Sequence, residues 1–194
     1  MIIGITGGTG SGKTTLLKLI EARGGKILDC DAIYHQLLRT DRSLLDAIEA
    51  EFPGTVIDGT LDRKKLGAIV FADKQKLLTL NEITHSAVKT EVLKQLDGDL
   101  IAIDAIGLFE GDLASLCDVT VAVIAPTEQR VVRLMARDGI SESYARSRIA
   151  AQHDDDWYRE KCGYVLENSG SLEDFTANCL AFLRGIGIIK ATTE

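Results

Sequence analysis

The glycine-rich segment Gly7–Thr14 constrains the fold of this chain more than any other feature. It reads Gly-Gly-Thr-Gly-Ser-Gly-Lys-Thr, follows the apolar run Ile2–Thr6 and opens an amphipathic helical pattern over Lys13–Ala22. Glycines let the backbone curl until successive N–H groups face one anion, and the start of a helix adds its positive dipole end. The spacing matches G-x-x-x-x-G-K-[ST], so it predicts a phosphate-binding loop between a strand and a helix.

Each residue type in this loop has an expected task. Lys13 should reach the β- and γ-phosphates of a nucleotide and stabilise the charge that develops during transfer, which makes it a catalytic candidate. The Thr14 hydroxyl should ligate Mg²⁺. A glycine-rich turn of purely structural use would leave the Lys-Thr pair unexplained. The residues expected to hold the nucleotide phosphates are Gly8, Gly10, Ser11, Gly12, Lys13, Thr14 and Thr15.

Short apolar runs recur along the chain and end at small or acidic residues. They are apolar at nearly every position, which is typical of strands covered on both faces of a parallel sheet. Helical patterns separate them, as in right-handed βαβ units. The sequence therefore predicts an α/β fold, the three-layer αβα arrangement of P-loop proteins, with a five-stranded, mainly parallel sheet. The predicted strands are Ile2–Thr6, Lys26–Asp29, Leu100–Asp104, Val119–Ile124 and Tyr164–Leu166.

Two intervals between these strands are longer than a crossover needs. The first has a helical pattern with loops at Pro53-Gly54 and Asp58-Gly59, and the second is short and polar. We expect one unit with a helical insertion at 32–96 and a lid at 138–157. Its core comprises 1–31, 97–137 and 158–194.

Composition narrows the function classes. A net charge of -7 and a pI of about 5.0 argue against general nucleic-acid binding, which needs clustered Lys and Arg. No segment approaches the length of a membrane span, and the first residues do not read as a signal peptide. We therefore expect a cytoplasmic protein whose cysteines are free thiols, since Cys30, Cys117, Cys162 and Cys179 have neither zinc-site nor disulfide spacing.

Two acids follow the second predicted strand, at the sheet edge where α/β proteins bind ligands. Asp29 and Asp31 would point the same way if the extended geometry continued past Asp29. One of them can then accept the proton of an attacking hydroxyl. We favour Asp31 as this base, while the alternative that either acid only caps a helix beginning near Ala32 stays open.

Two more acids lie on the same predicted edge. Asp104 ends the third predicted strand, where P-loop proteins place a metal-side acid, so it is expected to hold Mg²⁺ through water. Glu110 lies in the loop that follows. A simple solubilising charge at the strand end is the alternative for both.

Arginines cluster toward the predicted lid. Three of them share one helix face, and two more follow in the lid itself. They form either a solvated charged face or a set of cations that closes over phosphates and excludes water. These arginines are Arg130, Arg133, Arg137, Arg146 and Arg148. The three histidines, His35, His85 and His153, lack metal-ligand spacing and suit structural or substrate-contacting roles.

These segments together resemble the dephospho-coenzyme A kinase family over almost the whole chain. The matching segments are Gly4–Thr15, Asp29-Cys30-Asp31, Gly59–Arg63, Phe71-Ala72, Asn81–His85, Asp104–Glu110, Arg137–Gly139, Arg148–Gln152 and Tyr164–Ser171. The resemblance implies that ATP, with Mg²⁺, phosphorylates the ribose 3′-hydroxyl of dephospho-coenzyme A, the last step of coenzyme A synthesis. It also implies that Asp31 is the base and that the helical insertion binds the coenzyme.

Further roles are implied by the same resemblance. Asn168 falls in the adenine-side loop, and Arg137 in the catalytic lid region. The implied substrate contacts are Asp31, His35, Arg63, His85, Leu108 and Glu110. Three positions depart from the family pattern: Ile106-Gly107 replaces Pro-Leu, His35 stands where arginine is common, and Ser86 replaces a proline.

Three other functions remain to be distinguished. Another small-molecule kinase, acting on a nucleoside or nucleotide, would share the loop, lid and sheet. A nucleotide-dependent switch would need guanine-reading residues, and the sequence has no Asn-Lys-x-Asp pattern. A coenzyme A-binding protein without catalysis is the third, although Lys13, Thr14 and Asp31 are all present.

Overall fold

The computed structural model describes residues 1–189 and contains a five-stranded sheet in the order β2-β5-β1-β6-β7. β1 pairs in parallel with β5 and with β6, and β6 pairs in parallel with β7. The predicted five-stranded parallel sheet is therefore confirmed, with β5 starting one residue later and β7 ending one residue later than expected. The strands are β1 (Ile2–Thr6), β2 (Lys26–Asp29), β5 (Ile101–Asp104), β6 (Val119–Ile124) and β7 (Tyr164–Glu167).

The contacts within the chain define two compact units, which we call the sheet unit and the helical unit. Among residues 1–189, the sheet unit comprises Met1–Ile27, Gly98–Leu108 and 116–189, and the helical unit comprises Leu28–Asp97 and Phe109–Ser115. The predicted insertion 32–96 falls within the helical unit. That unit also takes in residues 28–31, which the sequence had assigned to the core, because the helix after β2 begins at Cys30.

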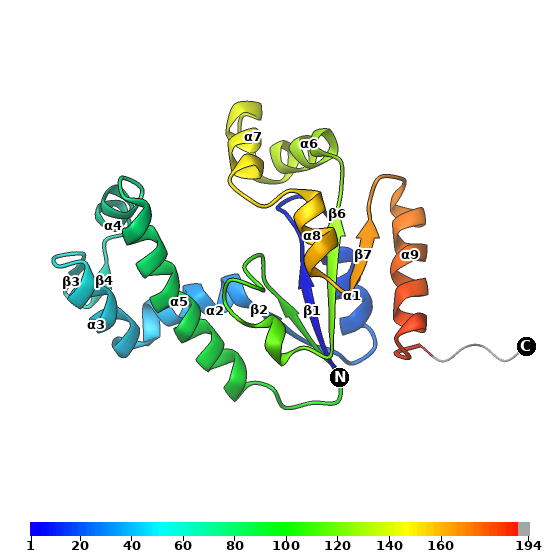
Figure 1. Ribbon diagram of the computed structural model, residues 1–194, viewed down its shortest axis with the longest axis horizontal. Helices are drawn as coiled ribbons and strands as arrows, with labels where there is room; N and C mark the ends of the chain where they lie inside the picture. The colour runs from blue at the N-terminus through cyan, green and yellow to red at the C-terminus, as the bar shows by residue number, and fades with distance from the viewer. Residues whose placement is uncertain (190–194) are drawn as a thin grey trace, which may run out of the picture. The chain divides into compact units, whose positions relative to one another are not determined.

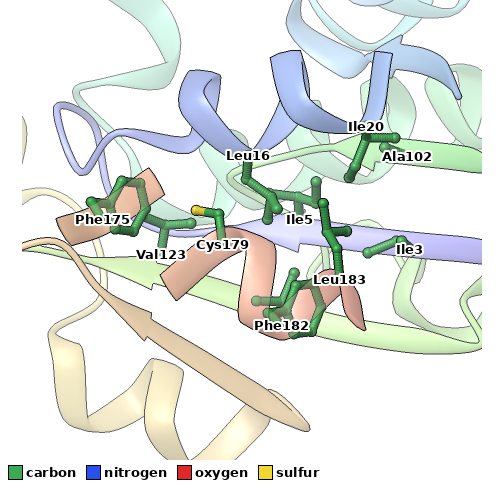
Figure 2. Packing of buried hydrophobic residues seen from close by; sticks show 11 residues of the cluster. Ile3, Ile5, Leu16, Ile20, Ala102, Val123, Phe175, Cys179, Phe182 and Leu183 are labelled. Atoms are coloured by element: carbon green, nitrogen blue, oxygen red, sulfur yellow. The ribbon is translucent and has the colours of Figure 1, made fainter. Parts of the chain in front are cut away.

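The core of the sheet unit lies on the face of the sheet covered by α1 (Lys13–Glu21) and α9 (Leu172–Gly185). Figure 2 shows side chains of α1 and α9 meeting those of the central strands. The buried cluster consists of Ile3, Ile5, Leu16, Ile20, Ala102, Val121, Val123, Phe175, Cys179, Phe182 and Leu183. Such packing is what fixes the end of β1, and with it the glycine-rich loop.

Three more helices complete the sheet unit: α6 (Thr127–Asp138), α7 (Glu142–Ala150) and α8 (Asp155–Lys161). Figure 1 shows α6 and α7 beyond the carboxyl end of β6. A small apolar cluster of Val131, Leu134, Ala145 and Ile149 packs α7 onto α6. The predicted lid segment therefore contains a helix that is anchored on α6.

The helical unit is built on α2 (Cys30–Thr40), α3 (Arg42–Glu51), α4 (Arg63–Val70) and α5 (Lys74–Lys94). Aspartates cap all four helices through their side chains, since Asp29, Asp41, Asp62 and Asp73 each accept a backbone N–H. Between α3 and α4 lies a hairpin of β3 (Val56–Ile57) and β4 (Thr60–Leu61). Its turn, Asp58-Gly59, has φ values of 50° and 74°, as a type I′ turn requires. A 3₁₀ turn, η1 (Ala114–Leu116), precedes β6.

The four cysteines, which all lie within residues 1–189, form no disulfide bond there. Burial raises the pKa of the Cys162 and Cys179 thiols to about 11, so both are unreactive in this environment. Within residues 1–189, no helix is both long and apolar enough to cross a lipid bilayer.

Candidate active site

The glycine-rich loop has the backbone of an anion cradle. Gly7, Gly10 and Gly12 have φ values of 127°, 77° and 106°, which side-chain-bearing residues rarely adopt. α1 begins at Lys13, and its N-cap residue Gly12 supplies no side-chain cap. The positive end of this helix therefore suits phosphate oxygens, while the Thr15 N–H donates to the Gly12 carbonyl at 3.1 Å.

The carbonyl groups of the loop are held from the side of α6 and β7. Asn168 is buried and donates from Nδ2 to the Ser11 carbonyl at 2.8 Å. Arg133 donates from Nη1 to the carbonyls of Gly10 and Ser11, at 3.3 and 3.2 Å. Its Nη2 also lies 3.3 Å from Asn168 Oδ1. In a trans peptide the C=O and N–H groups point in opposite directions, so these contacts help to aim the following N–H groups away from α6.

Lys13 and Arg130 also donate to carbonyl groups of this loop. Lys13 donates from Nζ to the Gly7 carbonyl at 2.8 Å, which holds its charge at the loop. Arg130, almost fully buried, donates from Nε to the Thr9 carbonyl at 2.9 Å. Burial lowers the pKa of Arg130, and the nearby carboxylate of Asp155 partly offsets this effect. The guanidinium stays charged, because the ordinary pKa of arginine is far above neutral pH.

The remaining arginines bind acids of α6 and α7. Arg137 makes a two-pronged ion pair with Asp138, with Nε to Oδ1 at 2.6 Å and Nη2 to Oδ2 at 3.0 Å. Arg148 adds a bond of 2.7 Å to the same carboxylate. These bonds, that of Arg137 foremost, lower the pKa of Asp138 to about 2. Arg146 likewise donates to Glu128 from Nη1 and Nη2, at 2.8 and 2.7 Å.

Arg137 therefore occupies the last turn of α6, not the lid segment, and its hydrogen bonds within residues 1–189 go to Asp138. Of the five arginines, Arg130 and Arg133 are the two that contact the loop. A catalytic role for Arg137 requires it to exchange Asp138 for a phosphate.

The residues expected to hold Mg²⁺ both belong to the sheet unit. Thr14 is exposed in the first turn of α1, and Asp104 ends β5 in register with Ile5 of β1. Within residues 1–189 no cluster of three or more His, Cys, Asp or Glu side chains forms a metal site. One hydroxyl and one carboxylate suit Mg²⁺, which keeps several waters and takes its other ligands from phosphates.

The two acids after β2 adopt different roles. Asp29 is the N-cap of α2 and accepts the Ala32 N–H at 2.9 Å, whereas Asp31 lies exposed in the first turn. The condition under which Asp29 and Asp31 would point the same way is not met, because the chain turns helical at Cys30 after the cap at Asp29. The capping alternative therefore applies to Asp29, and Asp31 is left available as a base.

Three of the implied substrate contacts come together in the helical unit. Asp31 and His35 are one turn apart on α2 and share a face. Arg63, the first residue of α4, has its Nη2 3.5 Å from His35 Nδ1. An exposed acid, an imidazole and a guanidinium thus form a polar group suited to a ligand with hydroxyl and phosphate groups.

The other implied contacts lie on other segments of the chain. His85 is half-buried on α5, and Glu110 is exposed in the turn of the segment 109–115. Leu108 is fully buried in the sheet unit, where a Cβ on Gly4 would lie 2.9 Å from its side chain. In this structure the side chain of Leu108 therefore packs in the core.

Sequence reasoning missed how the loop is braced. Gln152 accepts the Thr9 N–H at 2.8 Å, and Gln129 joins Arg133 to the Ser169 carbonyl. Uncharged side chains far along the chain give no signal of such contacts. Only the helical spacing of Arg130 and Arg133 indicated that α6 presents cations on one side.

Comparison with known proteins identifies the family of this chain. The family model of dephospho-CoA kinase matches residues 1–174. The chain belongs to this family. The dephospho-CoA kinase of Carboxydothermus hydrogenoformans is 37% identical, over 94% of this chain and 93% of that protein. The family matched is the one that the motifs had indicated.

Solved structures agree with this membership. The crystal structure of TT1252 from Thermus thermophilus has a TM-score of 0.78 at 36% identity, covering 96% of this chain and 97% of that one. The dephospho-CoA kinase from Campylobacter jejuni has a TM-score of 0.68 at 25% identity, covering 95% and 96%. The likeness extends over the sheet, the lid segment and the helical unit, since both alignments span nearly the full chain.

Proposed function

We propose that this dephospho-CoA kinase family member transfers the γ-phosphoryl group of ATP to the ribose 3′-hydroxyl of dephospho-coenzyme A, giving coenzyme A and ADP. This reaction is the last step of coenzyme A synthesis. One observation carries the proposal: in a chain matched by the family from residue 1 to 174, Lys13 and the uncapped start of α1 present positive charge at one loop. A cytoplasmic location belongs to the same proposal and follows the biosynthetic role.

On the nucleotide side, the chain's task is to hold and neutralise phosphates. The N–H groups at the start of α1 bind the β- and γ-phosphate oxygens, and Lys13 exchanges the Gly7 carbonyl for them. Mg²⁺, held by Thr14 and through water by Asp104, would supply further positive charge at the phosphates. Arg133 and Asn168 bind the Ser11 carbonyl and so hold the loop in place. The N–H donors of the loop then need no reorganisation as negative charge develops on the transferred phosphoryl group.

On the acceptor side, Asp31 accepts the proton of the 3′-hydroxyl as the oxygen attacks phosphorus. It is exposed and not engaged in capping, unlike Asp29. His35 and Arg63 lie beside it and suit the phosphate groups of the acceptor. The carboxylate acts by position, as the bases of phosphoryl-transfer enzymes do.

An acceptor panel tests the proposal. Purified protein with Mg-ATP is assayed for ADP release with dephospho-coenzyme A, adenosine, AMP and pantothenate in parallel, with Lys13→Ala as the inactive variant. We expect turnover with dephospho-coenzyme A alone. Turnover confined to another hydroxyl acceptor would replace the substrate and keep the kinase chemistry. Silence with every acceptor would favour a coenzyme A-binding protein without catalysis.

A further inference from the structure

Both peptide groups of Thr9 are held by side chains from distant parts of the chain. Its N–H donates to Gln152 Oε1 at 2.8 Å, and its carbonyl accepts from Arg130 Nε at 2.9 Å. Arg130 Nη2 also lies 3.2 Å from the same Gln152 oxygen. Arg130, Gln152 and the Thr9 backbone therefore form a closed set of hydrogen bonds, which we call the Thr9 clamp.

Arg130 packs against the glycine-rich loop. The residue is only 3% exposed, and its side-chain hydrogen bonds within residues 1–189 go to a backbone carbonyl and an amide oxygen rather than to a carboxylate. A Cβ on Gly8 would overlap its guanidinium, and one on Gly10 would lie 3.0 Å from its backbone oxygen. Burying a charge in this way is costly, so each of its bonds to Thr9 and Gln152 matters for the arrangement.

The clamp fixes the direction of a peptide plane in the phosphate cradle. The Thr9 carbonyl and the Gly10 N–H belong to one planar trans peptide and point in opposite directions. Because Arg130 binds the carbonyl, the Gly10 N–H is turned away from Arg130. The Thr9 N–H, in turn, is taken up by Gln152 and is not available to a phosphate.

Gln152 adds a link to the segment that carries the lid arginines. It follows α7 by two residues, and α7 is packed on α6. Its single oxygen accepts from the loop and from α6 together. A shift of the segment after α7 therefore acts on the Thr9 peptide directly.

We propose that Arg130 and Gln152 are positioning residues for phosphoryl transfer: they hold the Thr9 peptide so that the Gly10 N–H faces the phosphates. They act through the loop backbone and touch neither nucleotide nor acceptor. The kinetic part of this inference rests on the proposed function, whereas the structural part does not.

The test compares Gln152→Met, which keeps the length and removes the acceptor oxygen, with Gln152→Glu, which keeps an acceptor for both donors. Amide hydrogen exchange at Thr9 is followed by NMR, with the buried Ile5 amide as the reference for global stability. Affinity for ADP, kcat and the KM for each substrate are measured on the same samples. Ser147→Ala serves as the control, since it removes a hydrogen bond within α7 that does not reach the loop.

We expect Thr9 exchange in Gln152→Met to accelerate about 10-fold relative to Ile5, as the loss of one hydrogen bond predicts. We expect kcat/KM for ATP to fall by roughly 10- to 100-fold through misplacement of the loop, with the KM for the acceptor unchanged. Gln152→Glu should keep slow exchange at Thr9, and Ser147→Ala should match the unmodified protein in every measurement.

Thr9 exchange and kcat/KM for ATP both within about twofold of the unmodified protein in Gln152→Met would overturn the inference. So would equal acceleration in Gln152→Met and Gln152→Glu, because the acceptor oxygen would then be irrelevant. If the unmodified protein transfers no phosphate, the proposed function fails, while slow exchange at Thr9 that depends on the Gln152 oxygen would still support the clamp.

Discussion

Asn168 Nδ2 donates to the Ser11 carbonyl at 2.8 Å, which ties the loop after β7 to the phosphate cradle 157 residues earlier in the chain. The side chain is buried, and a Cβ on Gly12 would overlap its amide nitrogen. The resemblance had placed this residue in the adenine-side loop of the family. In the structure the side-chain amide is engaged with the glycine-rich loop, so we expect Asn168 to affect ATP binding through the loop backbone.

Asn168→Ala should therefore weaken both the fold and nucleotide binding. Leaving the buried Ser11 carbonyl with fewer donors should lower the free energy of unfolding by about 1–3 kcal/mol and raise the Kd for ADP. Urea unfolding and titration calorimetry measure the two effects. Asn178→Ala, on the exposed side of α9, is the matched control. Equal behaviour of the two variants would show that the Asn168 contact carries no energy.

The variants Asp31→Asn and Asp29→Asn should distinguish the proposed catalytic base, Asp31, from the helix cap, Asp29. Asn is a good N-cap residue, so Asp29→Asn should keep α2 and change kcat only a few-fold. Asp31→Asn removes the proton acceptor and should lower kcat about 10²-fold or more, with the Kd for ADP unchanged. Steady-state rates with dephospho-coenzyme A and ADP titrations decide it. The reverse order of the two effects would assign the base to Asp29.

Asp138 should make stability depend on pH in a narrow acidic window. Its pKa is lowered to about 2 by hydrogen bonds from Arg137 and Arg148. A lowered pKa in the folded state contributes stability above the unfolded value near 3.8, and that contribution disappears as the pH falls through about 2. The difference in Tm between the unmodified protein and Asp138→Asn should stay constant from about pH 8 to 5 and shrink between about pH 4 and 2.

Because Arg137 is 60% exposed, this difference should be small and should shrink further in 1 M salt. Thermal unfolding at a series of pH values, with and without salt, measures it. A difference in Tm that persists unchanged at the acidic end would mean that the ion pairs of Asp138 do not stabilise the fold.

Gly7→Ala should destabilise the protein much more than Gly24→Ala. Both glycines have positive φ, 127° and 79°, which costs alanine about 1–2 kcal/mol. At Gly24 nothing lies near the added methyl, whereas at Gly7 it would overlap the backbone carbonyl of Val123 in β6. We expect a further loss of about 1–3 kcal/mol for Gly7→Ala. Equal midpoints of urea unfolding would show that the loop can move away from β6.

The features that could be predicted are those that depend on residues close together in the sequence. The loop Gly7–Thr14 carries its own backbone requirements, and continuous apolar runs such as Val119–Ile124 identify buried parallel strands. α2 begins at Cys30, slightly before the expected start near Ala32, because the Asp29 cap ends the extended geometry at the end of β2. Aspartate is common both at helix N-caps and at the ends of strands, so its presence in the sequence does not distinguish the two. The hydrogen bond from the Ala32 N–H shows that Asp29 is a cap.

The bracing of the loop depends on contacts between residues far apart in sequence, which spacing cannot show. Arg130, Arg133 and Arg137 share a helix face, yet two bind loop carbonyls and the third binds its neighbour Asp138. Leu108, implied as a substrate contact, packs in the core in this structure. Helical periodicity places side chains on a face but does not say which partner each one meets.

The most direct test of the central claim is the position of the new phosphate group. The product of a reaction with Mg-ATP and dephospho-coenzyme A is purified and examined by ³¹P NMR with correlation to the ribose protons. We predict one new phosphomonoester coupled to the ribose H3′, formed in equal amount with ADP. A phosphate on any other atom of the acceptor, or ADP formed without a phosphorylated acceptor, would contradict the account.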